Sequence, residues 1–145
     1  MLTLRTQIQI AATPERVWNI LMDFPGHRQW NPFVRSLEGT PRVGETLKVF
    51  IQPPGGRGMQ FRPKVLCVEA TREFRWKGKL LVPGLFDGEH FFLVEREPDG
   101  SVLFTQGETF SGLLVPLMKT SLEGPTKAGF VAMNEALKRK AEASQ

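Results

Sequence analysis

The sequence predicts an α+β fold, in which one long C-terminal helix packs on an antiparallel sheet of six or seven strands. Two observations predict it. A series of short alternating apolar and polar segments fills most of the chain before residue 112. From about Pro116 to Ala141 the sequence instead predicts one amphipathic helix, whose apolar stripe is Met118, Leu122, Gly129, Phe130, Met133 and Leu137. A lone helix after a strand meander has to bury such a stripe on the sheet.

Length and composition are those of one globular domain, residues 1–145, with 41% hydrophobic and 23% charged residues. Cys67 is the single cysteine, so no intrachain disulfide can form. Two histidines argue against a metal cluster, and no cofactor is expected. The formal net charge is +4, but the basic residues are scattered, which favours a solvated face over a nucleic-acid interface. The first residues form no apolar leader and no 18-residue apolar run occurs, which predicts a cytoplasmic protein without stable membrane insertion.

The N-terminal third predicts a strand, two short helices and a second strand. Residues 2–11 alternate as a strand does. Thr13 is a suitable N-cap and Pro14 a suitable first helical residue, and Pro25-Gly26 ends that helix. The segment Trp30-Asn31-Pro32-Phe33 leads into a strand through residue 37. Further strands are predicted near residues 46–51, 60–69, 73–82, 88–97 and 101–111.

The last two strands share a tight connection, Pro98-Asp99-Gly100. A three-residue loop there places Phe92 opposite Gln106 and His90 opposite Glu108. A two-residue loop would shift the register by one and mix the two faces. The three-residue loop therefore predicts one inner face that is apolar except for His90, Gln106 and Glu108.

Three connections rich in Gly and Pro are predicted to lie together at one end of the domain, namely 53–58, 83–88 and 112–116. The last two carry apolar residues, so this end has an apolar rim. Arg57 and Arg62 near the rim could attract an anionic head group, although a solvated charge is the simpler reading. Proline inside a helix removes a hydrogen bond, so Gly124-Pro125 predicts a static kink, two successive helices or a hinge.

This layout resembles the START-like (SRPBCC) superfamily, with its birch-pollen-allergen-like proteins and its polyketide cyclase/dehydrase and lipid-transport family. The resemblance spans nearly the whole chain and rests on Ala12-Thr13-Pro14-Glu15-Arg16-Val17-Trp18, Trp30-Asn31-Pro32-Phe33, Val43-Gly44 and the Trp76 strand. It implies a helix-grip fold, in which a curved sheet wraps around the last helix and often leaves an apolar cavity. The superfamily has no shared catalytic signature, so it implies no catalytic residue here. Gly124-Pro125 departs from the unbroken last helix that the resemblance implies.

His90, Gln106 and Glu108 are the candidate polar site. An imidazole opposite a carboxylate could act as a general base, and polar groups in an apolar cavity could orient a ligand. Alternatively, they bond to one another and only hold the structure. The predicted ligand-binding residues are these three with Trp30, Phe33, Phe61, Trp76, Phe86, Phe92, Phe104, Phe110, Met118, Leu122, Phe130 and Met133. Phe91 and Leu93, on the outer face, could form a small dimer contact, so a monomer and a homodimer both remain open.

Three functions are compatible with these observations. The first is binding of a small hydrophobic ligand, such as a lipid, a fatty acid or a polyketide-like molecule, between the sheet and the last helix. The second is a polyketide cyclase or dehydratase with His90 or Glu108 as the general base. The third is an adaptor that presents its surface to a protein partner. A core without a cavity would argue against the first two.

Overall fold

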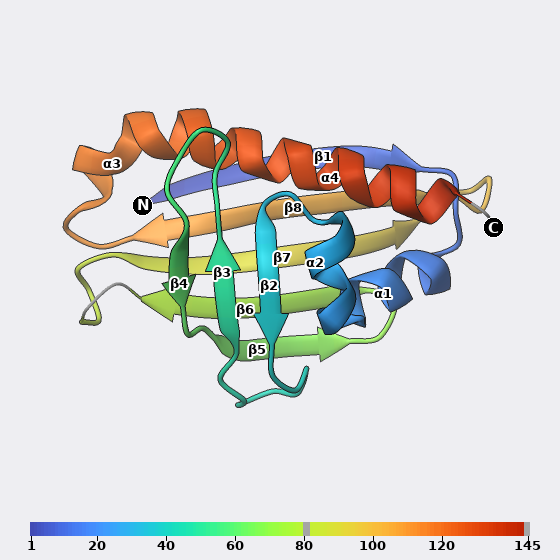
Figure 1. Ribbon diagram of the computed structural model, residues 1–145, viewed down its shortest axis with the longest axis horizontal. Coiled ribbons are helices and arrows are strands. Elements are labelled where there is room, and N and C mark those ends of the chain that lie inside the picture. Colours follow the sequence, from blue (N-terminus) through green and yellow to red (C-terminus); the bar gives the residue numbers. More distant parts are fainter. Residues whose placement is uncertain (80–81, 144–145) are drawn as a thin grey trace.

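The computed structural model describes residues 1–79 and 82–143, which form two antiparallel sheets and a long C-terminal helix (Figure 1). The large sheet has the order β1-β8-β7-β6-β5 and the small sheet the order β2-β3-β4. The small sheet crosses in front of the large one in Figure 1. The strands are β1 (Leu2–Ile10), β2 (Val34–Glu38), β3 (Lys48–Ile51), β4 (Met59–Phe61), β5 (Lys64–Glu69), β6 (Glu73–Lys79), β7 (Asp87–Arg96) and β8 (Val102–Ser111).

The predicted α+β helix-grip fold is confirmed, but the strands divide into two sheets. The segment expected as one strand over residues 60–69 is split into β4 and β5 at Pro63. Proline has no N–H to donate to a ladder, which suits a point where the chain leaves one sheet for the other. The Pro63 carbonyl accepts from the Leu47 N–H at 2.8 Å, just before β3 begins. Part of the strand predicted at 73–82 lies in residues 80–81, outside the described residues.

The β7–β8 hairpin has the predicted register. His90 pairs with Glu108 and Phe92 with Gln106. The Glu97 N–H donates to the Ser101 carbonyl at 2.8 Å, and Gly100 has φ 88°, so the loop is the three-residue type. The inner face expected from this loop is therefore correct.

Two short helices and one 3₁₀ turn follow β1, as α1 (Pro14–Met22), η1 (Phe24–Gly26) and α2 (His27–Trp30). Thr13 Oγ1 accepts from the Arg16 N–H at 3.1 Å, which is the predicted N-cap. Asn31 then fixes the turn into β2, since its Oδ1 accepts from the N–H groups of Phe33 and Val34 at 3.0 and 2.9 Å. Its Nδ2 lies 3.0 Å from His27 Nδ1, while His27 Nε2 lies 2.8 Å from the Leu21 carbonyl.

His27 makes the stability of this corner depend on pH. Its Nε2 must donate to the Leu21 carbonyl, and its Nδ1 accepts from the Asn31 amide, so the folded ring is neutral. Burial lowers the pKa of His27 below its ordinary value of 6.5, although the Leu21 carbonyl and Asp23 partly oppose this. The unfolded chain therefore binds more protons below pH 6.5, and stability falls as the pH drops. We expect the free energy of unfolding to fall between pH 7.5 and 5.5 by about 1 kcal/mol at most through His27.

Urea denaturation at the two pH values measures this loss. In His27→Gln the decrease should be smaller, because the titrating group is gone. An equal decrease in both proteins would show that His27 does not contribute to it.

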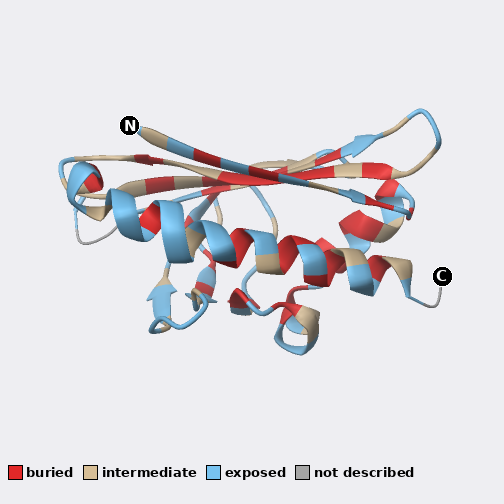
Figure 2. Cartoon of the chain, turned by 90° about the horizontal axis from the view of Figure 1, so that it is seen from above, coloured by how far each residue is buried: buried red, intermediate tan, exposed pale blue. Residues whose placement is uncertain are grey.

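The C-terminal helix runs over 28 residues in three segments, α3 (Val115–Ser121), η2 (Leu122–Thr126) and α4 (Lys127–Glu142). The middle segment is a π turn, in which the Lys127 N–H donates to the Leu122 carbonyl five residues earlier. Pro125 lies inside it, so the predicted interruption is confirmed at Gly124-Pro125. Phe130, Met133 and Leu137 are fully buried, as the apolar stripe predicted. Figure 2 shows the helix on the same side of the large sheet as the small sheet.

The apolar pair on the outer face of the large sheet is less exposed than the sequence predicted. Phe91 is only 5% exposed, because the guanidinium groups of Arg5 and Arg75 cover its ring at 5.9 and 5.0 Å from the centroid. Leu93 beside it is half-buried. Phe91 and Leu93 therefore do not form an exposed apolar patch, because arginine side chains cover the aromatic ring.

Candidate functional site

A cavity of about 380 Å³ lies between the two sheets and the first half of the C-terminal helix. Strands β3, β4, β6 and β8 contribute to its walls, and the segments α3 and η2 close one side. Val49, Trp76, Phe110 and Leu122 are buried lining residues, whereas Arg57 at the rim is exposed. The cavity is therefore an apolar chamber with an opening to solvent at one end.

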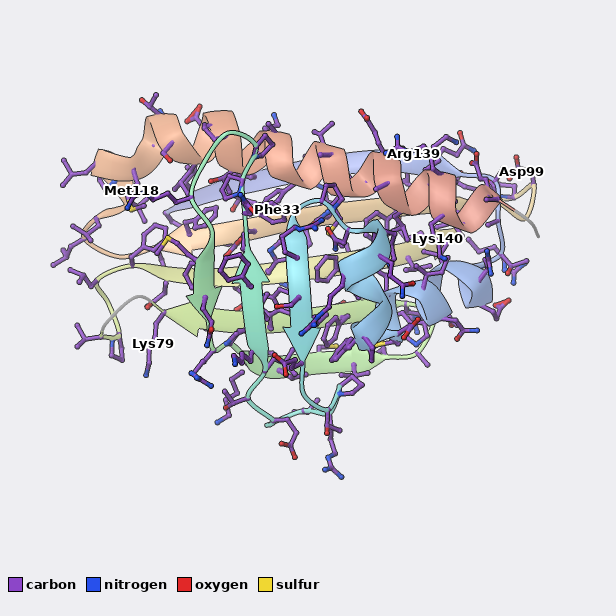
Figure 3. All side chains as sticks on the ribbon, in the orientation of Figure 1. Phe33, Lys79, Asp99, Met118, Arg139 and Lys140 are labelled. Atoms are coloured by element: carbon purple, nitrogen blue, oxygen red, sulfur yellow. The ribbon has the colours of Figure 1, made fainter. Side chains whose placement is uncertain are left out.

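At one end the cavity reaches the predicted apolar rim, where Phe86 of the 83–88 connection lines it. The Leu113 and Leu114 N–H groups donate to the Gly84 and Leu85 carbonyls at 3.1 and 3.0 Å, so these two connections lie side by side. Pro53 and Gly56 of the β3–β4 connection line the same cavity. In Figure 3 Met118 and Lys79 lie at this end of the domain, and Asp99 lies at the other.

Eight of the fifteen predicted ligand-binding residues line the cavity. They come from α3, η2, both sheets and the connections between elements: Phe33, Phe61, Trp76, Phe86, Glu108, Phe110, Met118 and Leu122. Their role in binding stays a prediction, but the structure brings them together around one space.

The other seven predicted residues lie outside the lining. Trp30 packs on the His27 ring at 4.9 Å between centroids and is only half-buried. Phe92, Phe104, Phe130 and Met133 fill the core beyond the cavity, where α4 packs directly on the large sheet. His90 and Gln106 are also fully buried behind the cavity wall, so their predicted direct contact with a ligand is not supported.

Gly129 explains where the cavity stops. A Cβ at this position would overlap the ring of Phe33, which packs edge-on against Phe130 at 5.4 Å between centroids. The absence of a side chain lets Phe33 reach α4 and form the inner wall. Figure 3 shows Phe33 beside the helix, just before β2 begins.

From the strands of the small sheet, sequence reasoning named only Phe61 of β4 as a cavity residue and missed the other residues that β3 and β4 contribute. Val49, Ile51 and Met59 line it from β3 and β4, and Arg57, Lys79, Pro125 and Thr126 lie at its edge. The alternation of residues 46–51 predicted a strand but could not say that β3 faces the large sheet across a gap. Among the basic residues expected near the rim, Arg57 lines the cavity, whereas Arg62 is exposed and does not.

A chain of buried polar side chains runs from the cavity into the core. His90 Nδ1 lies 3.0 Å from Glu108 Oε1, and His90 Nε2 lies 2.9 Å from Gln106 Oε1. Gln106 Nε2 donates to Asn134 Oδ1 at 2.8 Å, and Asn134 Nδ2 donates to Thr6 Oγ1 at 2.8 Å. The predicted polar trio is therefore confirmed as one network, to which β1 and α4 add Thr6 and Asn134.

Glu108 is the member of this network that reaches the cavity. Its side chain is 16% exposed, whereas that of His90 is 1% exposed. Three aromatic rings surround His90, those of Trp76, Phe92 and Phe130, at 5.2, 4.6 and 5.0 Å between centroids. A ligand in the cavity would meet the carboxylate of Glu108, and His90 would act only through it.

None of the helices within the described ranges combines the length and the apolar character needed to cross a bilayer.

The cavity opening carries two exposed basic residues, Arg57 and Lys79. The site is thus an apolar space with one internal carboxyl group and a basic rim.

A family model described as polyketide cyclase / dehydrase and lipid transport matches residues 1–142. The chain belongs to this family. Solved structures of similar fold include a START superfamily protein from Mycobacterium smegmatis, with TM-score 0.75, 19% identity and 99% of both chains covered. An aromatase/cyclase from a Streptomyces species has TM-score 0.79 and 14% identity, over 97% of this chain and 93% of that one.

A Mesorhizobium loti protein is also similar, with TM-score 0.76, 20% identity and 99% of both chains covered. At these identities the solved structures support the fold alone. No curated protein sequence is significantly similar to this family member. Membership of this family confirms the START-like resemblance of the sequence.

Proposed function

We propose that the protein binds a small apolar molecule, such as a lipid, a fatty acid or a polyketide-like compound, in the cavity between the sheets and the C-terminal helix. The observation that carries this proposal is the cavity of about 380 Å³, whose lining includes the rings of Phe33, Trp76 and Phe110. Protein interiors are close-packed, and an apolar space of this size is typical of a ligand site. Membership of a family described by lipid transport and polyketide chemistry supports it.

Burial of apolar surface supplies the affinity. Each Å² removed from water contributes about 25 cal/mol, so covering roughly 250 Å² of ligand contributes about 6 kcal/mol before the cost of immobilisation. The lining is aromatic and aliphatic, with Trp76, Phe110 and Leu122 among its buried members. Met118 and the π turn at the opening are adaptable elements that suit entry of a flexible ligand.

The fluorescent probe N-phenyl-1-naphthylamine tests this proposal, because it is neutral, apolar and small enough for the cavity. We expect its emission to rise on binding to the purified protein. Val49→Phe replaces a small side chain of the cavity lining with a phenyl ring. It should weaken binding by at least about tenfold, since the cavity cannot hold both this ring and the probe. A titration of probe fluorescence measures both affinities.

Leu66→Phe is the matched control. It adds a ring on β5, where Leu66 is exposed and does not line the cavity, and it should leave the affinity unchanged. Equal weakening by both substitutions, or no effect of Val49→Phe, would contradict binding in this cavity.

A cyclase or dehydratase is the second candidate function, and the His90–Glu108 pair at the cavity wall favours it. The pair has the geometry of a base and its orienting partner, at 3.0 Å. The family description, which includes polyketide cyclase and dehydrase, agrees with this alternative. If the protein is such an enzyme, Glu108 is the residue placed to touch the substrate, and His90 positions it.

A further inference from the structure

In the hydrogen-bond network behind the cavity, the donor and the acceptor of each contact follow from one backbone carbonyl, that of Gln106. The Gln106 carbonyl can only accept, so Thr6 Oγ1 must donate its proton to it, at 2.8 Å. Thr6 Oγ1 then accepts from Asn134 Nδ2, which turns Asn134 Oδ1 towards Gln106. Gln106 must therefore present its amide Nε2 to Asn134 and its Oε1 to His90.

A second contact supports this orientation of the Gln106 amide. Gln106 Nε2 also lies 3.4 Å from the Phe130 carbonyl, which is again only an acceptor. A flipped amide would set oxygen against oxygen at both Phe130 and Asn134. Because Oε1 faces His90 Nε2 at 2.9 Å, that ring nitrogen must carry a proton.

The fixed tautomer determines what lies between His90 and Glu108. His90 Nδ1 and Glu108 Oε1 are 3.0 Å apart, and without a proton two lone pairs would face each other in a buried place. The pair therefore holds one proton, either on Nδ1 beside a carboxylate or on Oε1 beside a neutral ring. In both arrangements the other carboxyl oxygen, Oε2, carries no proton.

Glu108 Oε2 is the oxygen left for a ligand. Within the described residues no protein group donates to it, and Glu108 lines the cavity. Gly88 of β7, which pairs with Phe110 and lies diagonally from Glu108, leaves room for this oxygen, since a Cβ there would overlap it. The exposed Arg57 and Lys79 at the opening disfavour a cationic ligand.

We propose that Glu108 Oε2 is an acceptor-only anchor that selects apolar ligands carrying a hydroxyl group at their inner end, with Thr6, Asn134 and Gln106 as positioning residues. This inference rests on the proposed ligand-binding function and adds a chemical class to it. An ether, a carbonyl or a carboxylate at the same position would place an acceptor against an acceptor. The ligand donates its hydroxyl proton to Oε2, and no bond is made or broken.

A matched pair of probes tests the selection. 2-Naphthol carries a hydroxyl group, and 2-methoxynaphthalene has the same ring system without the donor. We expect 2-naphthol to bind about tenfold more tightly, measured by isothermal titration calorimetry and by displacement of N-phenyl-1-naphthylamine. In Glu108→Leu the preference for 2-naphthol should fall to within about twofold. The methoxy group is larger than the hydroxyl group in both proteins, so the difference between the two proteins isolates the effect of the hydrogen bond.

Glu108→Gln provides the conservative rescue. Its amide N–H can donate to His90 Nδ1 in place of the shared proton, which leaves the amide oxygen facing the cavity as an acceptor. This variant should keep the preference for 2-naphthol. The ring ¹⁵N chemical shifts of His90 should show a protonated Nε2 in the native protein, and in Gln106→Leu, which removes the acceptor facing Nε2, the tautomer should no longer be fixed.

The outcomes separate the two proposals. Equal affinity for the two naphthalenes in the native protein, an unchanged preference in Glu108→Leu, or an unprotonated Nε2 would overturn the hydroxyl selection and leave ligand binding intact. Failure of 2-naphthol to bind a protein that binds N-phenyl-1-naphthylamine would also overturn it. Failure of N-phenyl-1-naphthylamine itself would count against the proposed function.

Discussion

Replacing Phe130 by alanine is expected to lower the free energy of unfolding by about 3–5 kcal/mol. Phe130 is fully buried where α4 crosses the large sheet, and its ring packs on those of Phe33 and His90 at 5.4 and 5.0 Å between centroids. Truncation would remove the contact of the helix with the cavity wall and with the polar network at once. Equilibrium denaturation in urea or guanidinium chloride measures the loss.

The neighbouring residue provides a matched control for this substitution. Val131 lies on the opposite side of α4 and is 40% exposed. Val131→Ala should change the free energy of unfolding by no more than about 0.5 kcal/mol. Comparable losses in the two variants would contradict the packing of the predicted stripe on the sheet.

Replacing Gly107 by alanine should cost about 3 kcal/mol, although it adds only one methyl group. Gly107 lies in β8, between Arg5 of β1 and Phe91 of β7. A Cβ there would overlap both the Leu4 carbonyl and the Phe91 ring. The carbonyl belongs to the strand ladder, so no change of side-chain rotamer relieves that overlap.

Gly124→Ala is the control for the added methyl group. Gly124 lies in the π turn, and a Cβ there would meet open space. The substitution should be neutral or stabilise the protein by up to about 1 kcal/mol, since alanine favours helical backbone. If Gly107→Ala were as stable as Gly124→Ala by chemical denaturation, the close contact of β1 and Phe91 at Gly107 would be wrong.

The strand register and the helix stripe could be predicted because each follows from local periodicity. The three-residue loop at Pro98–Gly100 fixed which residues of the last two strands face each other, and so placed His90 opposite Glu108. The spacing of Phe130, Met133 and Leu137 fixed the buried side of the helix. Gly124-Pro125 marked the interruption that became the π turn.

The division into two sheets could not be predicted from alternation. A strand pattern says that a segment has one buried face, but not which sheet buries it. Pro63 was the available signal, because it cannot donate to a central ladder. Reading residues 60–69 as one strand hid the step from β4 to β5 and, with it, the contribution of Val49 and Ile51 to the cavity.

The extent of the cavity also depends on contacts that no local pattern encodes. Phe92 and Phe110 both lie on the inner face of the large sheet, yet the former fills the core and the latter lines the cavity. The boundary between them is set by Phe33 reaching α4 beside Gly129, a contact between residues far apart in the chain. Thr6 and Asn134 joined the polar network for the same reason, since β1 and α4 meet only in the folded protein.

Intermolecular nuclear Overhauser effects between bound N-phenyl-1-naphthylamine and the methyl groups of the protein test the central claim most directly. The cavity predicts contacts from the probe to Val49 and Leu122, which line it from β3 and from η2. Leu66 and Leu117 are exposed residues outside the lining and should show none. Contacts to Leu66 or Leu117 without contacts to Val49 and Leu122 would contradict ligand binding between the sheets and the helix.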